Sequence, residues 1–456
     1  MSPTPEEYAQ LVLEARNREY PASVQRADIV GEIPAPAPFN TVSIITGIRR
    51  CGKTFYAFQL IRRLISQGTD PDRIFYFDFS DDRLMPIADT LLDDVVNEYW
   101  RQVPEARSEG CYLFLDEIQD APNWQGFCRR IAEHERVTLV ITGSSSKLSS
   151  DEIATNFRGR SLEYPMMPLS FREYCEFRSM DVPRSSELAR VGSVAPALQT
   201  ELEAAYSDYL VTGGFPGVQR LAEPERIRTL QTYARDIVAR DVAERAGRTD
   251  IALANQISLF GLRNTGCDLS VNGLAEHLRS VGFKTTWGSV SQLVRLFEQA
   301  HLLEFLPEYA TALSPATNAM QKVYGEDPGL VHAVSRAHQQ DIGKRFETAV
   351  YLELRRRLFG SRIETLTSYT APTAKREKID FLVGDALSPE PYALIQATVT
   401  MAHEKTRKRE ISSLEKAMEL TGAAQGTIVS LREQETVETK AGVIHVVPAW
   451  LWTLSK

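Results

Sequence analysis

The sequence predicts an α/β protein, with a parallel sheet and phosphate-binding loop first, a helical and winged-helix middle, and a second α/β domain at the C-terminus. Three observations support this prediction. The pattern G-x-x-x-x-G-K-[S/T] occupies residues 47–54, between an apolar β-branched run and a helical run. A later apolar run ends in the acids Asp116 and Glu117. Over residues 181–245 the apolar positions follow helical spacing.

Size and composition limit the class of protein. The 456 residues suffice for about three domains, and 43% hydrophobic with 25% charged residues is typical of a soluble globular protein. No apolar run approaches the roughly 18 residues that span a bilayer, and the N-terminus lacks a secretion signal. Five scattered cysteines indicate reduced thiols and argue against a zinc site. We expect a cytoplasmic protein without a membrane partner. Its net charge of −8 indicates that any surface for nucleic acid is a local basic face.

The phosphate loop predicts ATP as the cofactor. A strand is expected over residues 41–46 and a helix over residues 55–64, which aims backbone N–H groups and a positive helix end at phosphates. Lys53 would reach the β- and γ-phosphates, and the Thr54 hydroxyl would bind Mg²⁺. An ordinary surface turn is the alternative, and the flanking strand and helix argue against it. The predicted nucleotide-binding residues are Gly47, Arg49, Arg50, Cys51, Gly52, Lys53, Thr54 and Phe55.

Two acids follow at the end of a predicted strand. Strands are expected over residues 73–79 and 111–116. Asp116 would hold the Mg²⁺ water shell, and Glu117 would polarise the water that attacks the γ-phosphate. The alternative is a plain strand-to-loop transition. The phosphate loop upstream favours the catalytic interpretation.

A fourth strand, over residues 137–142, leads into polar residues at the edge where ligands of parallel sheets bind. Ser144 or Ser145 there would sense the γ-phosphate, unless the segment is only a Gly/Ser turn. Arg158 and Arg160, on either side of a glycine, suit an arginine finger offered to the nucleotide of a neighbouring subunit. A solvated basic turn explains the two arginines equally well.

These features resemble a family of prokaryotic AAA+-type ATPases that carry a C-terminal domain of unassigned function. The resemblance covers nearly the whole chain and implies an AAA+ core, a winged-helix segment and a restriction-endonuclease-like terminal domain. It implies no biological role. The matching pieces are residues 47–54, 115–119, 141–145, 158–160, 168–174, 213–216, 235–237, 322–324, 343–347 and 379–381, with Trp124, Asp327, Gly329 and Leu330.

On this basis five segments are expected: an N-terminal helical lead (1–38), the ATPase core (39–180), a helical segment (181–245), a winged helix (246–335) and a degenerate nuclease-like domain (336–456). Ser270 and either Thr285 or Thr286 would cap the two main helices of the winged helix. Its second helix carries only Arg295, with Lys284 before it. Packing between subunits is therefore at least as well supported as base reading, and sequence-specific recognition is not expected.

The C-terminal domain has part of a nuclease site. Restriction-endonuclease-like folds place an Asp on one strand and Glu-x-Lys on the next, with the carboxylates on Mg²⁺. Asp380 fits the first position and Glu347 fits a supporting helix. Gln396 and Thr398 stand where the Glu and Lys are required, and neither can replace them chemically. We expect a dismantled site without nuclease activity.

Two dense basic runs flank these predicted strands and would grip DNA phosphates without reading sequence. The alternative is a solvated helix face and a loop. Lys405 or Lys408 could also reach the degenerate site and supply its missing charge. The predicted DNA contacts are Lys375, Arg376, Lys378, Lys405, Arg407, Lys408 and Arg409.

The sequence thus predicts an Mg²⁺-dependent, ATP-hydrolysing protein that remodels or translocates DNA. Structure-directed binding to branched DNA, with branch migration as the activity and a hexameric ring as the assembly, fits a winged helix poor in base-contacting side chains. Two alternatives stay open. One is a STAND-like signalling or defence ATPase triggered by a partner protein, and the other is an active Mg²⁺-dependent nuclease.

Overall fold

The computed structural model describes residues 3–144, 157, 159–185, 188, 194–247, 250–309, 320–335, 341–360, 365–384 and 392–455. The chain divides into two compact units, Met1–Met167 and Pro168–Lys456. The finer division into five segments stays a prediction. Among the described residues, no helix combines the length and apolar character needed to cross a membrane.

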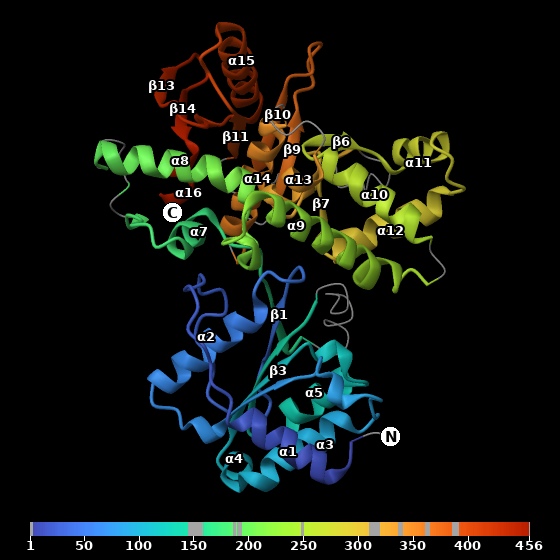
Figure 1. Cartoon of the computed structure of the whole chain (residues 1–456). Coiled ribbons are helices and arrows are strands. Elements are labelled where there is room, and N and C mark those ends of the chain that lie inside the picture. The colour runs from blue at the N-terminus through green and yellow to red at the C-terminus, as the bar shows by residue number, and fades with distance from the viewer. Residues whose placement is uncertain are drawn as a thin grey trace. The chain divides into compact units, whose positions relative to one another are not determined.

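The first unit is a five-stranded parallel sheet with flanking helices (Figure 1), which confirms the predicted fold class. The strand order is β2-β3-β4-β1-β5, and four of these strands lie where the sequence predicts them. The fifth, β5, follows the Arg-Gly-Arg segment and was not predicted. The elements are α1 (Pro5–Arg16), β1 (Val42–Thr46), α2 (Lys53–Ser66), β2 (Ile74–Asp78), α3 (Leu91–Gln102), α4 (Pro104–Ser108), β3 (Cys111–Asp116), α5 (Trp124–His134), β4 (Val137–Thr142) and β5 (Ser161–Pro165).

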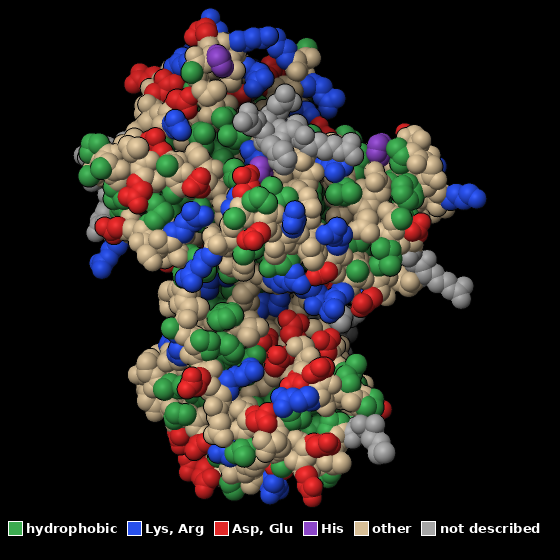
Figure 2. Space-filling view, viewed as in Figure 1, with side chains coloured by type: hydrophobic (Ala, Val, Ile, Leu, Met, Phe, Trp, Pro, Cys, Tyr) green, Lys and Arg blue, Asp and Glu red, His purple; other side chains and the backbone are tan. Residues whose placement is uncertain are grey.

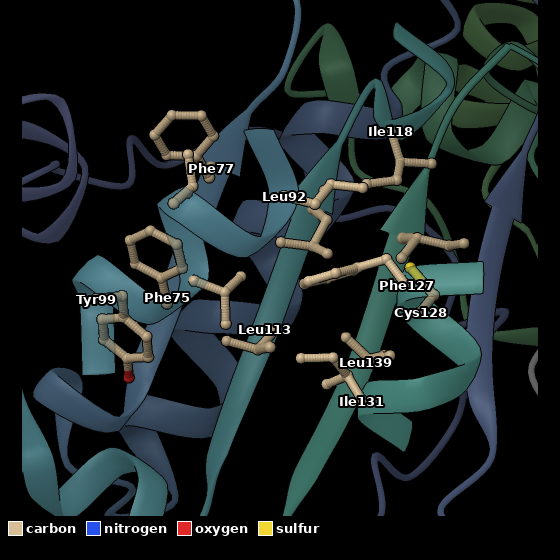
Figure 3. Close-up of a cluster of buried hydrophobic side chains, with 14 of the residues drawn as sticks. Phe75, Phe77, Leu92, Tyr99, Leu113, Ile118, Phe127, Cys128, Ile131 and Leu139 are labelled. Carbon is tan, nitrogen blue, oxygen red and sulfur yellow. The ribbon is translucent and has the colours of Figure 1, made fainter. Parts of the chain in front are cut away.

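The strand order places the chemically important strand ends together. β4 pairs with both β1 and β3, so the carboxyl ends of the three strands meet at one edge of the sheet. Helices α3 and α5 cover one face of this sheet (Figure 3). On that face Phe75 stacks on Tyr99 with ring centroids 4.3 Å apart, and Leu113 and Leu139 are fully buried. Apolar burial of this extent fixes the strands and therefore the residues at their ends.

The second unit contains a six-stranded mixed sheet, β13-β14-β12-β11-β10-β9, and a three-stranded antiparallel sheet, β6-β8-β7. Strands over residues 378–383 and 392–399 were predicted and correspond to β10 and β11, whereas β9 and β12 to β14 were not predicted. The elements are α7 (Phe171–Phe177), α8 (Pro196–Thr212), α9 (Glu223–Ile237), α10 (Ile251–Arg263), β6 (Cys267–Leu269), α11 (Val271–Ser280), α12 (Trp287–Gln299), β7 (Leu303–Pro307), β8 (Gln321–Gly325), α13 (Pro328–Val334), α14 (Ile342–Leu358), β9 (Leu366–Thr370), β10 (Lys378–Val383), β11 (Ala393–Thr398), α15 (Glu404–Thr421), β12 (Gln425–Ser430), β13 (Glu435–Glu438), β14 (Val443–Pro448) and α16 (Ala449–Leu454).

The order α10-β6-α11-α12-β7-β8 is that of a winged helix. Ser270 caps α11 by accepting a hydrogen bond from the Gly273 amide. Thr286 caps α12 in a reciprocal box with Ser289. These caps confirm the helix starts expected from sequence, because a side-chain oxygen replaces the missing acceptor of the first turn.

The winged helix and the six-stranded mixed sheet are joined directly. The Tyr309 amide, just beyond β7, donates to the Ser368 carbonyl of β9 at 2.7 Å. The hydroxyls of Tyr309 and Tyr392 lie 2.8 Å apart. At the C-terminus, Arg172 of α7 donates to the Leu454 carbonyl at 2.7 Å. Polar contacts of this kind hold the second unit together along with its apolar core.

A buried group of hydrogen bonds and close backbone contacts connects the end of α8 with the start of α13. The Asp327 carboxylate accepts from the Gly214 amide at 2.5 Å and from the Leu330 amide at 2.8 Å. Gly329 packs so closely that an added Cβ would lie 2.3 Å from the Thr212 carbonyl oxygen. Backbone atoms cannot move aside as a flexible side chain can, so this position requires glycine.

We expect Gly329→Ala to destabilise the second unit by at least about 2 kcal/mol, because the new methyl overlaps backbone. The matched control is Gly343→Ala in the first turn of α14, where the nearest atom to an added Cβ is 4.0 Å away. There alanine should be neutral or stabilising by about 0.5–1 kcal/mol. Parallel urea unfolding of both variants and the wild type measures the difference. Equal stability of the two variants would contradict the close packing described.

Candidate functional site

The phosphate loop lies between β1 and α2, as the sequence predicts. Gly47 has φ +150°, and a Cβ there would lie 2.2 Å from the Met166 carbonyl oxygen. Lys53 is buried, and its Nζ donates to the carbonyl oxygens of Gly47 and Ile48 at 3.1 and 3.3 Å. The loop thus holds the ammonium group where the phosphates of a nucleotide would replace these acceptors.

The segment before β1 supports the loop from outside. Arg26 is buried and donates to the carbonyl oxygens of Cys51 and Met167 at 2.8 and 2.7 Å. Cys51 is fully buried, so its backbone shapes the loop and its thiol faces no solvent. The remaining predicted nucleotide contacts, Arg49, Arg50, Gly52 and Phe55, lie in the loop and on the first turn of α2.

Asp116 is enclosed by hydroxyl groups from three elements. Its Oδ2 accepts from the Thr54 hydroxyl at 2.7 Å and from the Tyr76 phenol at 2.6 Å. Its Oδ1 accepts from the Thr142 hydroxyl. Burial and the neighbouring Asp116 charge raise the pKa of Tyr76 well above its ordinary value, so the phenol remains a donor. The Asp116 side chain is 1% exposed.

This arrangement fits a magnesium site. Neutral hydroxyl donors orient the Asp116 carboxylate without cancelling its charge. The Thr54 hydroxyl beside it is the second oxygen expected of such a site. Thr54 and Asp116 could therefore hold Mg²⁺ together with nucleotide phosphates and water, as the sequence predicts.

Glu117 begins the turn after β3 in the left-handed conformation, with φ 50°. Its amide donates to the Thr142 hydroxyl at 3.3 Å. Its carboxylate accepts from the side-chain amide of Gln119 at 2.5 Å. An unusual backbone conformation held by hydrogen bonds is common where a catalytic side chain must be aimed. Gln119 therefore orients the proposed general base.

Ser144 lies at the carboxyl end of β4, close in the chain to Thr142. Its side chain is 2% exposed, and its hydroxyl has no hydrogen-bond partner among the described residues. A buried hydroxyl without a partner costs free energy unless a ligand supplies one. This supports phosphate sensing by Ser144. Ser145, the other candidate, lies outside the described residues.

Arg160 lies at the amino end of β5, where its carbonyl accepts from the Val42 amide. This is the sheet edge opposite the phosphate loop. The guanidinium pairs with Glu133 at 3.0 Å and lies over the Phe39 ring, 5.3 Å from its centroid. Arg160 thus cannot complete the nucleotide site of its own subunit. Arg158 lies outside the described residues.

At the degenerate nuclease site predicted from the sequence, Asp380 of β10 and Glu347 of α14 come together as predicted. Lys322 of β8, which was not predicted to belong to this site, lies between them. Its Nζ is 2.7 Å from Asp380 Oδ1 and 2.9 Å from Glu347 Oε1. The Tyr324 hydroxyl also donates to Glu347 Oε1, at 2.7 Å. Burial, together with the Asp380 charge, raises the pKa of Glu347 to about 7.

The other residues predicted for this site make hydrogen bonds or ion pairs within the domain. Gln396 Oε1 accepts from the Asp380 amide at 3.1 Å. The Thr398 hydroxyl donates to the Thr400 carbonyl at 3.4 Å. Lys408 pairs with Glu404 at 3.1 Å, so it does not supply the missing charge. With an ammonium group between the carboxylates, the residues present do not fit a divalent cation.

Four of the seven predicted DNA contacts form ion pairs within the chain. Glu410, the partner of Arg409, is buried, whereas both members of the other three pairs are partly or fully exposed. An exposed pair contributes about 0–1 kcal/mol, so in those three a phosphate can exchange with the acid. On the face shown in Figure 2, basic and acidic side chains are intermixed. For Lys375, Arg376 and Lys405 no ion-pair partner is found within the described ranges. The pairs are Lys378–Asp268, Arg407–Glu435, Lys408–Glu404 and Arg409–Glu410.

The site contains residues that motif reasoning missed. Tyr76 and Thr142 lie in correctly predicted strands, but nothing in their local sequence indicates that they contact Asp116. Lys322 belongs to a piece that matches the resembled family, and a lysine directly before the apolar residues Val323 and Tyr324 was the available signal. Arg26 lies in no recognisable pattern, and Gln119 belongs to the matching piece 115–119 without having been assigned a role.

Comparison with protein families and relatives agrees with the geometry. An AAA domain model matches residues 39–175, and a model of a domain of unknown function (DUF8612) matches residues 203–341. The uncharacterized protein MJ1544 of Methanocaldococcus jannaschii is 30% identical over 424 residues, which cover 91% of this chain and 89% of that protein. An uncharacterized protein of Haemophilus influenzae is 28% identical over 366 residues, covering 80% of this chain and 85% of its own.

Among solved structures, the Walker-type ATPase PABY2304 of Pyrococcus abyssi is similar, with 13% identity and a TM-score of 0.38. The match covers 73% of this chain and 95% of that one. The sheet order, the phosphate loop and the AAA match agree that the first unit is an AAA+ ATPase-like core. The chain therefore belongs to the family of AAA-domain proteins that includes MJ1544 of Methanocaldococcus jannaschii.

Proposed function

We propose that this chain is an Mg²⁺-dependent ATPase of AAA+ type that uses ATP turnover to remodel or translocate DNA. The observation that carries the ATPase part is the Asp116 carboxylate, oriented by neutral hydroxyls and 2.7 Å from the Thr54 hydroxyl. Lys53 and Glu117 lie at the same sheet edge. Binding, charge compensation and water activation are therefore provided within one site.

The residues have separable tasks in this mechanism. Lys53 exchanges its loop carbonyls for phosphate oxygens, and Thr54 and Asp116 hold the Mg²⁺ ion. Mg²⁺ held by these residues would supply positive charge that compensates the charge developing on the phosphates. Glu117 accepts the proton of the attacking water at its carboxylate, with Gln119 fixing its direction. The buried Ser144 hydroxyl finds its partner in a phosphate oxygen.

Arg160 supports assembly into a ring, which we propose to be hexameric. It lies at the edge of the sheet away from its own phosphate loop and pairs there with Glu133. In the proposed ring it would exchange this partner for the nucleotide of a neighbouring copy. An arginine presented to a neighbour stabilises charge in the transition state and couples hydrolysis to assembly. Arg158 is the second candidate for this task.

The DNA-binding part of the proposal depends on the winged helix. The exposed residues in the first turns of α12 are Trp287, Gly288, Gln292 and Arg295, and none is acidic. Such a surface can approach phosphates without repulsion, and few of its side chains can read bases. Branched DNA, including four-way junctions that migrate, is therefore the proposed substrate, and the nuclease-like domain holds DNA without cutting it.

A second function is favoured by a separate observation. Because Lys378, Arg407, Lys408 and Arg409 are already paired, the nuclease-like domain presents less free positive charge than the sequence suggests. A signalling ATPase triggered by a partner protein would need no basic surface. In that case ATP turnover would respond to a protein and not to DNA.

Replacing Glu117 by Gln should lower the ATPase rate by about 100- to 1,000-fold, because the general base is lost, while nucleotide binding is retained. The rates of both proteins are measured without DNA and with duplex, single-stranded and four-way-junction DNA. Several-fold stimulation by the junction in the wild type alone supports the proposal. An equal rate on all DNAs would remove the DNA motor and leave the protein-triggered ATPase.

Tyr76→Phe should raise the Mg²⁺ concentration needed for half-maximal ATPase activity by about tenfold, since a hydrogen bond to a charged group contributes about 1.5 kcal/mol. The control is Tyr99→Phe, which removes a phenol hydrogen bond to the Asp72 carbonyl in the same unit. That variant should lose stability and keep its Mg²⁺ dependence. Similar Mg²⁺ curves for both variants would show that Tyr76 is only structural.

Arg295→Glu should abolish the junction-stimulated part of the ATPase rate and leave the basal rate unchanged, because a negative charge on α12 repels phosphate. Arg101→Glu is the control, since Arg101 is an exposed surface arginine of α3, 69% exposed. The readout is the ratio of stimulated to basal rate at two salt concentrations. Retained stimulation in Arg295→Glu would exclude α12 as the DNA contact.

A further inference from the structure

Nuclease folds of this type hold a divalent cation between buried carboxylates, and here the same place contains a side chain. Asp380 and Lys322 are 8% and 7% exposed. The Lys322 Nζ lies 2.7 Å from Asp380 Oδ1 and 2.9 Å from Glu347 Oε1. These are distances of charge-assisted hydrogen bonds, so one ammonium group bridges both carboxylates.

Two further donors face the pair, one on each carboxylate. Asp380 Oδ2 accepts from the Ala397 amide at 3.0 Å. Glu347 Oε1 accepts from the Tyr324 phenol as well as from Lys322. A magnesium or manganese ion would need about six oxygen ligands near 2.1 Å, and it would have to displace a cation that is already well placed.

Lys322 belongs to a different part of the unit from the carboxylates it bridges. It lies on β8 of the winged helix, whereas Asp380 and Glu347 lie on β10 and α14 of the nuclease-like domain. The ion triad therefore crosses the boundary between the two parts. It lies in the same region as the backbone contact between Tyr309 and Ser368.

We propose that Lys322 is a resident counterion that takes the place of the nuclease metal. The carboxylate pair then serves to fasten the winged helix to the nuclease-like domain and binds no divalent cation. Removing the lysine charge uncovers a latent metal site, because a buried and a partly buried carboxylate without a cation attract one from solution. This inference is independent of the ATPase proposed above.

The test is Lys322→Met in the full chain, with Lys416→Met as control, because Lys416 makes an exposed pair with Glu419 on α15. We expect Lys322→Met to unfold about 10 °C lower than the wild type, since it leaves paired acids uncompensated. Added Mn²⁺ should restore much of the lost unfolding temperature in Lys322→Met. The unfolding temperatures of the control and the wild type should respond to Mn²⁺ equally. Nucleotide is omitted throughout.

Mn²⁺ binding is counted by electron paramagnetic resonance. Lys322→Met should bind one more Mn²⁺ than the wild type, and the double variant with Asp380→Asn should lose this site and regain stability. A folded Lys322→Met protein with no additional Mn²⁺ would overturn the proposal.

The single variant Asp380→Asn keeps the test decisive if Lys322→Met does not fold. It should bind as much Mn²⁺ as the wild type, because the native pair holds none. Loss of a bound Mn²⁺ in Asp380→Asn would show that metal displaces Lys322 in the native protein and would overturn the proposal.

Discussion

A carboxylate inside a protein costs several kcal/mol unless donors or a cation face it, and both units are organised by this constraint. In the first unit the carboxylate is Asp116, and its donors are hydroxyls from α2, β2 and β4. The strand order makes this possible because β4 lies between β1 and β3. Neutral donors satisfy the oxygens and leave the negative charge, which is the condition for attracting a magnesium ion.

The second unit meets the same constraint with cations. Lys322 faces Asp380 and Glu347. In a second buried group an arginine faces two acids in the same way. There Arg355 Nη1 lies 3.2 Å from Glu304 and 2.7 Å from Glu326. The ligand atoms of these two acids and of His301 lie close enough together to suit a metal ion. In each group the charge is already compensated. In our proposals, buried acids would thus hold a metal ion in the first unit, where neutral donors face them, and would not hold one in the second, where cations face them.

Sequence reasoning succeeded where the chemistry is local. The strand, loop and helix around Lys53, the acids after β3 and the cap at Thr286 are all contiguous, so their neighbours in sequence are their neighbours in space. The partners of Asp116 could not be predicted, since they depend on which strands pair. Lys322 is 58 positions from Asp380. The strand β5 was missed because an Arg-Gly-Arg segment is typical of a turn.

The ion-pair partners of the two basic runs could not be predicted from the sequence either, and these pairs affect how the runs could bind DNA. Arg407 follows Lys405 in a helix whose composition suggests a phosphate-binding face, yet its bidentate partner Glu435 comes from a later strand. An acid that already pairs with a basic side chain competes with DNA phosphate for it. The free energy gained by each phosphate contact is therefore only the difference between two similar interactions. Several such contacts would give weak binding with a steep salt dependence. The exposed residues in the first turns of α12 include no acid that could compete in this way. If Lys322 of β8 fastens the winged helix to the C-terminal sheet as proposed, that sheet would follow wherever the winged helix is placed.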